Sequence, residues 1–341
     1  MRVAVCYNQA PAVVKHGEAR DLIAEAGAFE QARAVDQALR ELGYRTGIIP
    51  LADSLNDFLR RLEQFAPTVV FNLCEGFRGN ARQEMNVAGV FELLGVPFTG
   101  SPPLCLGISQ DKPRTKALLT QKGLPTPPSC LALPHGKFPE VETLKFPLIV
   151  KPPYEDASQG IETASVVDDK RALMKRIRYI HEVYQQPALV EEFIVGRELN
   201  VAILGDGKLT VLPVAEITFA ADLPRAMVCF DSKWSPRSAA WHGTRPVCPA
   251  DLTAKEILLV NMIALRTFKL LGCRDYARVD IRLRNFTPFI LEVNANPDLS
   301  PDAGLARAAA AAKLSYPKLI ERILGCAVKR KENSHAGTQT Q

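Results

Sequence analysis

Short apolar runs alternate with a segment of helical periodicity over the first hundred residues. The runs are "RVAVCY" at 2–7, "RTGIIPL" at 45–51 and "PTVVFNLCEG" at 67–76. Between the first two, apolar side chains recur every three or four residues until Gly43 ends the pattern. Strand–helix–strand order predicts a parallel sheet covered by helices. We expect this first α/β lobe to span residues 1–105.

The remaining sequence predicts two further lobes, so that the fold class is α/β in three lobes. A proline-rich stretch from 102 to 139 leads into the second lobe, 106–205, which contains "FPLIVKPPYEDASQGI" and "ALVEEFIVGRELNVAILGDG". The third lobe, 206–328, contains the helical run "LTAKEILLVNMIALRTFKLLG" and the strands "YARVDIRLR" and "PFILEVNAN". The polar tail 329–341 is predicted to be disordered.

Composition excludes several classes of protein. The net charge of +5 in 341 residues is mild and scattered, which indicates a weak preference for anionic ligands and no nucleic-acid partner. We expect the partners to be small molecules. There is no apolar run of about 18 residues and no signal peptide, so we expect a cytoplasmic protein that does not enter the membrane. The eight cysteines form no C-x-x-C pair, which favours buried thiols over disulfides or zinc. No glycine fingerprint of an NAD-dependent enzyme follows a strand.

Two of the apolar strands in the third lobe carry acidic and amide side chains. Because side chains alternate along a strand, Glu292 and Asn294 share one face, and Asp280 lies on a face with Arg278 and Arg282. The connection "RNFTP" joins the strands as a hairpin. Oxygen ligands of this kind suit Mg²⁺. A solvent-facing polar stripe remains the alternative, although unpaired acids are costly in a strand with such apolar flanks.

Three other motifs are compatible with nucleotide binding and individually also with ordinary surface charge. Lys151 ends a buried strand and precedes a polar loop with Ser158, a pattern suited to phosphate. Lys112 begins a helix capped by Asp111, where anions bind readily. Glu191 and Glu198 flank a strand–turn–strand and could accept hydrogen bonds from ribose or adenine.

In combination, these motifs resemble the D-alanine–D-alanine ligase family of the ATP-grasp superfamily. The resemblance runs from roughly residue 68 to 325 and includes "GVPFTGS", "SQDKPRTK", "FPLIVKP", "VEEFIVGREL", "ARVDIRL" and "LEVNANP". It implies an α+β ATP-grasp fold, in which an N-terminal lobe precedes two lobes that grip ATP between their sheets. It also implies a homodimer, by analogy alone.

The resemblance assigns roles to individual residues. The implied ATP contacts are Lys112, Lys151, Ser158, Glu191, Glu192, Phe193 and Glu198, with Glu192 and Phe193 acting through their backbone. The implied ligands for two Mg²⁺ (or Mn²⁺) ions are Asp280, Glu292 and Asn294. The implied catalytic residues are Ser158, Arg278 for the tetrahedral oxyanion, and Lys233 of a mobile loop.

The amino-acid half of the family pattern is altered. The N-terminal Ser-x-Glu signature is absent, and Glu25 is the candidate for its replacement. "CEG" with Glu75 stands where the family has His-Gly, and Trp234 follows Lys233 where it has Tyr. Asp298 replaces a glycine, and Asp302 or its neighbour falls where a serine grips the acceptor carboxylate. An acid there would repel a carboxylate.

The resemblance therefore implies an ATP-dependent carboxylate–amine ligase that works through an acyl phosphate. The default substrate is D-alanine, for the dipeptide of peptidoglycan and hence cell-wall biogenesis. One alternative is a related ligase that joins a different acid to a different amine. Another is an ATP-binding protein without turnover.

Overall fold

The first lobe of the computed structural model is built on a parallel sheet, as the sequence predicted. The model describes residues 1–337 except 12–15, 24–26, 135 and 137–140. The strands β1 (Arg2–Asn8), β2 (Arg45–Leu51) and β3 (Val69–Leu73) pair in the order β2-β1-β3. The helices of this lobe are α2 (Ala28–Glu41), α3 (Leu55–Phe65) and α4 (Glu84–Leu93), with the short turns η1 (Ala19–Asp21) and η2 (Ala81–Gln83).

A second, antiparallel sheet has the order β4-β7-β5-β6. It consists of β4 (Ser129–Ala132), β7 (Ala188–Glu192), β5 (Leu148–Lys151) and β6 (Val166–Val167). Helix α7 (Lys170–Tyr179) and the π turn η5 (Ile180–Tyr184) pack on it through a core that includes Leu173, Ile177 and Val150. Helices α5 (Pro103–Gln110) and α6 (Lys112–Gln121) connect this region to the first lobe, and η3 (Val141–Thr143) and η4 (Thr163–Ser165) are short turns.

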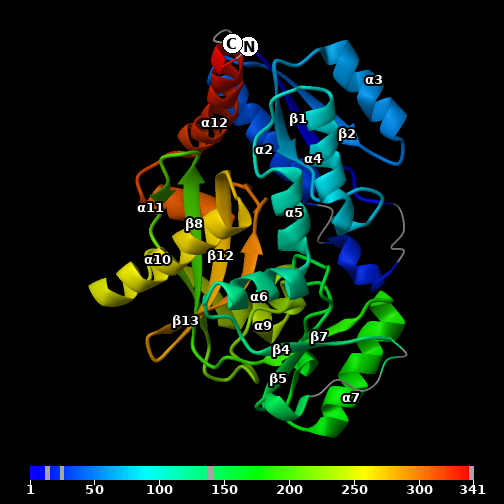
Figure 1. The fold of residues 1–341 in the computed structure, drawn as a ribbon, viewed down its shortest axis with the longest axis vertical. Coiled ribbons are helices and arrows are strands. Elements are labelled where there is room, and N and C mark those ends of the chain that lie inside the picture. The colour runs from blue at the N-terminus through cyan, green and yellow to red at the C-terminus, as the bar shows by residue number, and fades with distance from the viewer. Residues whose placement is uncertain (12–15, 24–26, 135, 137–140, 338–341) are drawn as a thin grey trace.

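The third sheet has six strands in the order β11-β10-β8-β12-β13, with β9 beside β8. The strands are β8 (Arg197–Gly205), β9 (Thr210–Val211), β10 (Ala215–Phe219), β11 (Thr244–Val247), β12 (Asp275–Arg284) and β13 (Thr287–Asn294). The helices are α8 (Phe230–Trp234), α9 (Ala239–Gly243), α10 (Ala254–Leu271), α11 (Gly304–Ala311) and α12 (Tyr316–Gly337). Figure 1 shows this sheet between the other two.

Strand β8 contributes side chains both to the hydrophobic core and to the lining of a pocket. Its residues Leu199, Val201 and Ile203 pack in the same core as helix α10. On the opposite face, Ala202 and Leu204 pack in the core of α11 and α12, whereas Glu198, further toward the start of the strand, lines a pocket. The domain boundaries remain predictions, but we propose from this sheet membership that the central lobe ends before Arg197 rather than at residue 205.

The C-terminal tail differs from the prediction. Residues 329–337 were expected to be disordered, but they continue helix α12. Arg330 anchors this extension, because its guanidinium donates to the Phe98 carbonyl at 2.8 Å and to Asp275 Oδ2 at 2.9 Å. Lysine, arginine and glutamate are good helix formers, so a polar composition did not distinguish a tail from a helix end.

Two smaller expectations can also be compared with the structure. The cysteines of the described residues are all free thiols, and most are buried, as predicted. In the described part of the chain, no helix is long and apolar enough to cross a membrane.

Candidate active site

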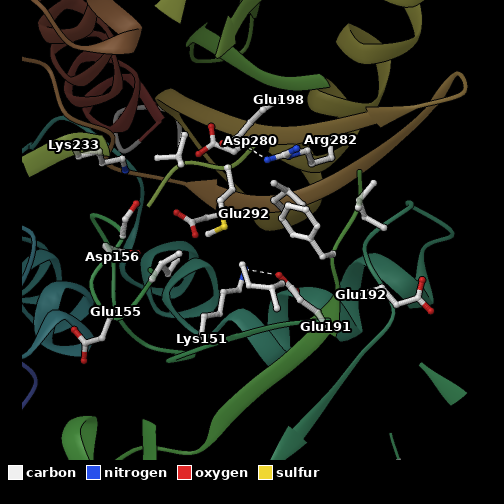
Figure 2. Close-up of a pocket in the computed structure, with 18 residues that line it drawn as sticks. Lys151, Glu155, Asp156, Glu191, Glu192, Glu198, Lys233, Asp280, Arg282 and Glu292 are labelled. Carbon is white, nitrogen blue, oxygen red and sulfur yellow. Dashed lines mark hydrogen bonds and ion pairs between the residues drawn. The ribbon is translucent and has the colours of Figure 1, made fainter. Parts of the chain in front are cut away.

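A pocket lies between the second and third sheets and opens to solvent (Figure 2). It encloses about 780 Å³ of empty space, including its mouth. Strands β5 and β7 contribute Lys151 and Glu191 from one side, and β12 and β13 contribute Asp280 and Glu292 from the other. Residues from four separate stretches of sequence therefore line the same pocket.

The hairpin of β12 and β13 brings the three predicted metal ligands together. Asp280 pairs directly with Glu292, and Asn294 pairs with Arg278. Asn285 and Phe286 both have positive φ at the turn, which is typical of a tight two-residue hairpin loop.

A β-bulge interrupts this pairing beside the site. The register shifts so that Asp280 faces Glu292 while Ile281 faces Ile290, which leaves Leu291 as an extra residue. Ile290 and Val293 can therefore both lie in the core, although strict alternation would put them on opposite faces. The bulge places Leu291 and Glu292 together in the lining of the pocket.

Asp280 is held by three neighbours. Arg278 donates to its two carboxylate oxygens at 2.7 and 2.9 Å, and Asn294 donates at 3.0 Å. Asn200 of β8 donates at 2.7 Å. The sequence reading missed Asn200, although the pairing of β8 with β12 would have placed it opposite Asp280.

Glu292 lies among cations. Its Oε2 is 3.7 Å from Lys112 Nζ. Burial disfavours the carboxylate, but Lys112, Lys151 and Lys233 outweigh that effect and lower the pKa of Glu292 to about 2. Glu292 is therefore an ionised anion at neutral pH, as a ligand for a hard cation must be.

Lys112 reaches the site from the first turn of α6. Asp111 caps the helix by accepting from the Arg114 N–H at 3.0 Å, as predicted. Lys112 Nζ donates to the Glu155 carbonyl at 2.5 Å and is 3.4 Å from Asp156 Oδ1. Burial opposes its charge, but Glu292 and Asp156 prevail and raise its pKa.

Glu191 is bound by two buried lysines. Its oxygens lie 2.6 Å from Lys151 Nζ and 2.7 Å from Lys116 Nζ. Burial raises the pKa of Glu191, but Lys116 and Lys151 together lower it overall. Lys116 was missed because it lies in the middle of a helical run in which nothing marks it as buried. Its ammonium also donates to Thr126 Oγ1 at 2.8 Å.

The other predicted ATP contacts differ in their surroundings. Glu198 pairs with Arg282 at 2.5 Å, a partner that the sequence reading did not assign. The side chain of Glu192 points away from the other labelled residues in Figure 2 and accepts from the Lys145 N–H at 3.0 Å. The N–H groups of Glu192 and Phe193 donate to the carbonyls of Pro128 and Pro147, both at 2.9 Å.

The loop 155–161 and helix α8 border the pocket together. Ala157 and Ser158 have φ of 51° and 63°, a left-handed conformation that costs a residue with a Cβ about 1–2 kcal/mol. Trp234 Nε1 donates to the Ala157 carbonyl at 3.0 Å, while Ser158 and Lys233 line the pocket.

The described residues predicted to contact the amino-acid substrates do not line the pocket as most of the predicted ATP contacts do. Glu25 lies outside the described residues. Glu75, Asp298 and Asp302 are exposed, and none of them lines the pocket. Asp298 Oδ1 accepts from the Ser300 N–H at 2.7 Å.

Arg307 of α11 is a further basic residue beside this half. It donates to the Asp302 carbonyl, and its Nε is buried without a hydrogen-bond partner. A Cβ on Gly304 would lie 3.9 Å from Arg307 Nη2 and 4.0 Å from Arg278 Cδ, so two arginines flank this glycine. Burial lowers the pKa of Arg307, and Asp302 opposes that effect. The sequence does not show that Arg307 and Arg278 lie close together, because about thirty residues separate them along the chain.

The donor set can be tested for its fit to Mg²⁺. No group of three or more His, Cys, Asp or Glu among the described residues could hold a metal ion without other donors. Asp280 and Glu292 supply two carboxylates and Asn294 an amide, and Mg²⁺ is usually bound by one or two carboxylates together with substrate phosphates. The residues therefore fit Mg²⁺ that is shared with a nucleotide.

This combination of fold and site defines the ATP-grasp class, in which two sheets enclose the nucleotide. The family model described as "D-ala D-ala ligase C-terminus" matches residues 118–325. A D-alanine–D-alanine ligase of Desulforudis audaxviator is 33% identical over 87% of this chain and 92% of its own. An uncharacterized protein, y4sG of Sinorhizobium fredii, is 35% identical over 97% of this chain and 98% of its own.

A crystal structure agrees with these matches. The D-alanine–D-alanine ligase of Bacillus anthracis, complexed with ATP, has a TM-score of 0.78 at 25% identity and covers 98% of this chain and 99% of its own. The chain belongs to the D-alanine–D-alanine ligase family. It is an ATP-dependent ligase of the amide-forming kind, as the sequence predicted.

Proposed function

We propose that this protein joins a carboxylate to an amine through an acyl phosphate, with Mg²⁺ as cofactor. The observation that carries the proposal is the pairing of Glu292 with Asp280 among the cations Lys112, Lys151, Lys233 and Arg278. Phosphoryl transfer requires positioning and neutralisation of charge more than covalent chemistry by the protein, and this arrangement provides both. Two Mg²⁺ ions, held by Asp280, Glu292 and Asn294, would neutralise phosphate charge.

The chain's residues would then act in two steps. Lys112 and Lys151 bind the phosphates while a carboxylate oxygen of the first substrate attacks the γ-phosphorus and ADP leaves. The amine of the second substrate attacks the acyl carbon, the bond to phosphate breaks, and the amine nitrogen releases a proton to solvent. Arg278 lies next to Asp280 and would stabilise the oxyanion. Glu191, Glu198 and the backbone at Glu192 and Phe193 would hold adenine and ribose.

The proposed substrates are two D-alanines, which would give the dipeptide of peptidoglycan in the cytoplasm, with a homodimer as the working form. A second candidate is a ligase for a different acid and amine. The altered residues Glu75, Trp234, Asp298 and Asp302 favour it, because acids in the second-substrate region would repel a lone carboxylate unless Arg307 offsets them. Glu25 remains a candidate for holding the first ammonium.

A phosphate-release assay tests these proposals. Purified protein with ATP and Mg²⁺ should release phosphate only when suitable amino acids are added, and a panel of D- and L-amino acids, singly and in pairs, identifies both substrates. Asn294→Ala should lower turnover at least 100-fold with an unchanged fold by circular dichroism. Activity with other pairs but not D-alanine would favour the second candidate. The absence of release with any pair would overturn the ligase proposal in favour of an ATP binder without turnover.

A further inference from the structure

A strap from the first lobe, defined as Gly17–Asp21, is fastened to the second lobe beside the pocket. The Gly17 N–H donates to the Val183 carbonyl at 2.9 Å. Tyr179 donates to Glu18 Oε1 at 2.6 Å, and Tyr184 donates to Asp21 Oδ2 at 3.1 Å. Figure 1 shows this segment as the dark blue turn just above α7.

Arg20 is the residue of the strap that contacts Glu162 and helix α8. Its guanidinium pairs with Glu18 and Glu162, and it lies 3.8 Å from Asp231 Oδ1. It also stacks over the ring of Phe230, at 4.9 Å from the centroid. One planar cation therefore contacts three carboxylates and a ring from three separate stretches of chain.

The partners of Arg20 mark the junction of two pocket-lining elements. Glu162 directly follows the loop 155–161, and Phe230 is the first residue of α8. The Phe230 N–H donates to the Ile161 carbonyl at 2.8 Å, and Trp234 at the other end of α8 donates to Ala157. Arg20 thus lies where the loop with Ser158 and the helix with Lys233 are joined.

We propose that Arg20 is a positioning residue that holds the loop 155–161 and helix α8 in place over the phosphates of ATP. This inference rests on the proposed function, because Ser158 and Lys233 line the pocket in which ATP would bind. Each ion pair is partly exposed and individually weak. Their common cation has a larger effect, because without it Glu18, Glu162 and Asp231 would lose a shared partner. The strained backbone at Ala157 and Ser158 also requires surrounding contacts to persist.

Fluorescence provides a direct test, because the chain has two tryptophans and one of them is Trp234. In a Trp241→Phe background, Trp234 alone reports on the contact between α8 and the loop. We expect Arg20→Ala to make Trp234 about twofold more accessible to acrylamide and to weaken binding of a non-hydrolysable ATP analogue with Mg²⁺ about tenfold. Arg20→Lys keeps the positive charge but lacks the planar guanidinium that contacts several carboxylates at once. It should therefore show most of the defect of Arg20→Ala in quenching and in analogue binding.

The controls separate this role from general stability and from the proposed function. Arg33→Ala removes an exposed ion pair on α2 and should behave as the background does. Tyr179→Phe removes one of the three hydrogen bonds that hold the strap and leaves Arg20 unchanged. It should give a smaller defect, which keeps the test usable if Arg20→Ala folds poorly. Unchanged quenching and analogue binding in Arg20→Lys and Tyr179→Phe would overturn the proposal. Neither measurement needs turnover, so a background that binds the analogue but releases no phosphate counts against the proposed function alone.

Discussion

The proposed nucleotide half and the proposed amino-acid half of this site differ in how their charged side chains are buried and paired. Between the two sheets, Lys151 and Glu191 are buried and paired within hydrogen-bond distance. Beyond β13, Asp298 and Asp302 are exposed, and Arg307 keeps a buried nitrogen without a partner. Pairs that are buried together constrain one another strongly, since losing one member leaves the other desolvated. The exposed half can change with little effect on the fold, so substrate choice can change while nucleotide binding is kept.

The largest expected effect breaks a buried pair in the nucleotide half. Lys116→Met leaves Glu191 with Lys151 alone. We expect the free energy of unfolding to fall by about 3 kcal/mol, the lower end of the range for breaking a buried ion pair. Urea unfolding measures this. Lys318→Met, which removes an exposed pair with Glu321, should cost less than about 1 kcal/mol. Similar losses in the two variants would refute the contrast drawn here.

A smaller effect should come from the amino-acid half. Arg307→Ala removes the second guanidinium beside Gly304, and we expect KM for the second substrate to rise about tenfold, or about 1.4 kcal/mol. KM for ATP and the free energy of unfolding should stay nearly constant. Arg322→Ala, an exposed arginine of α12, is the matched control. If KM for ATP rose instead, the two halves would not be separable.

The smallest effect concerns pH. Burial raises the pKa of Glu155 to about 7, with repulsion from Asp156 adding to it and Gln186 opposing it. A raised pKa means that the folded protein holds the proton more tightly. Its stabilising contribution is therefore full below about pH 4.5 and is lost as the pH rises through about 7.

Thermal unfolding between pH 5 and 8 checks this expectation. In Glu155→Gln, the decline of stability from pH 5 to pH 8 should be smaller than in the wild type by roughly 1 kcal/mol, after allowance for the partial exposure of the side chain. An exposed glutamate on α3, tested as Glu63→Gln, is the control. A wild-type slope in Glu155→Gln would show that another group dominates this range.

Sequence reasoning reached most of the fold, because local periodicity records which face of an element is buried. The parallel first sheet, the hairpin of β12 and β13 and the two closing helices were predicted from pattern alone. The prediction of disorder was wrong for residues 329–337, because Arg330 binds Asp275, whose place in the fold no local pattern reveals. The boundary at 205 stays a prediction, and local pattern does not reveal the pairing of β8 with β12, whose partners lie 70 to 86 residues apart.

Alternation along two strands was sufficient to place Asp280, Glu292 and Asn294 on neighbouring positions of one surface, because side-chain direction follows from the backbone repeat. It could not provide their electrostatic setting. Lys116 meets Glu191, and Lys112 meets Glu292, across 75 and 180 residues of chain, and the bulge at Leu291 depends on pairing between strands. Charges act through space and change with burial. Which cations surround Glu292, and how low its pKa falls, are therefore properties of the folded molecule alone.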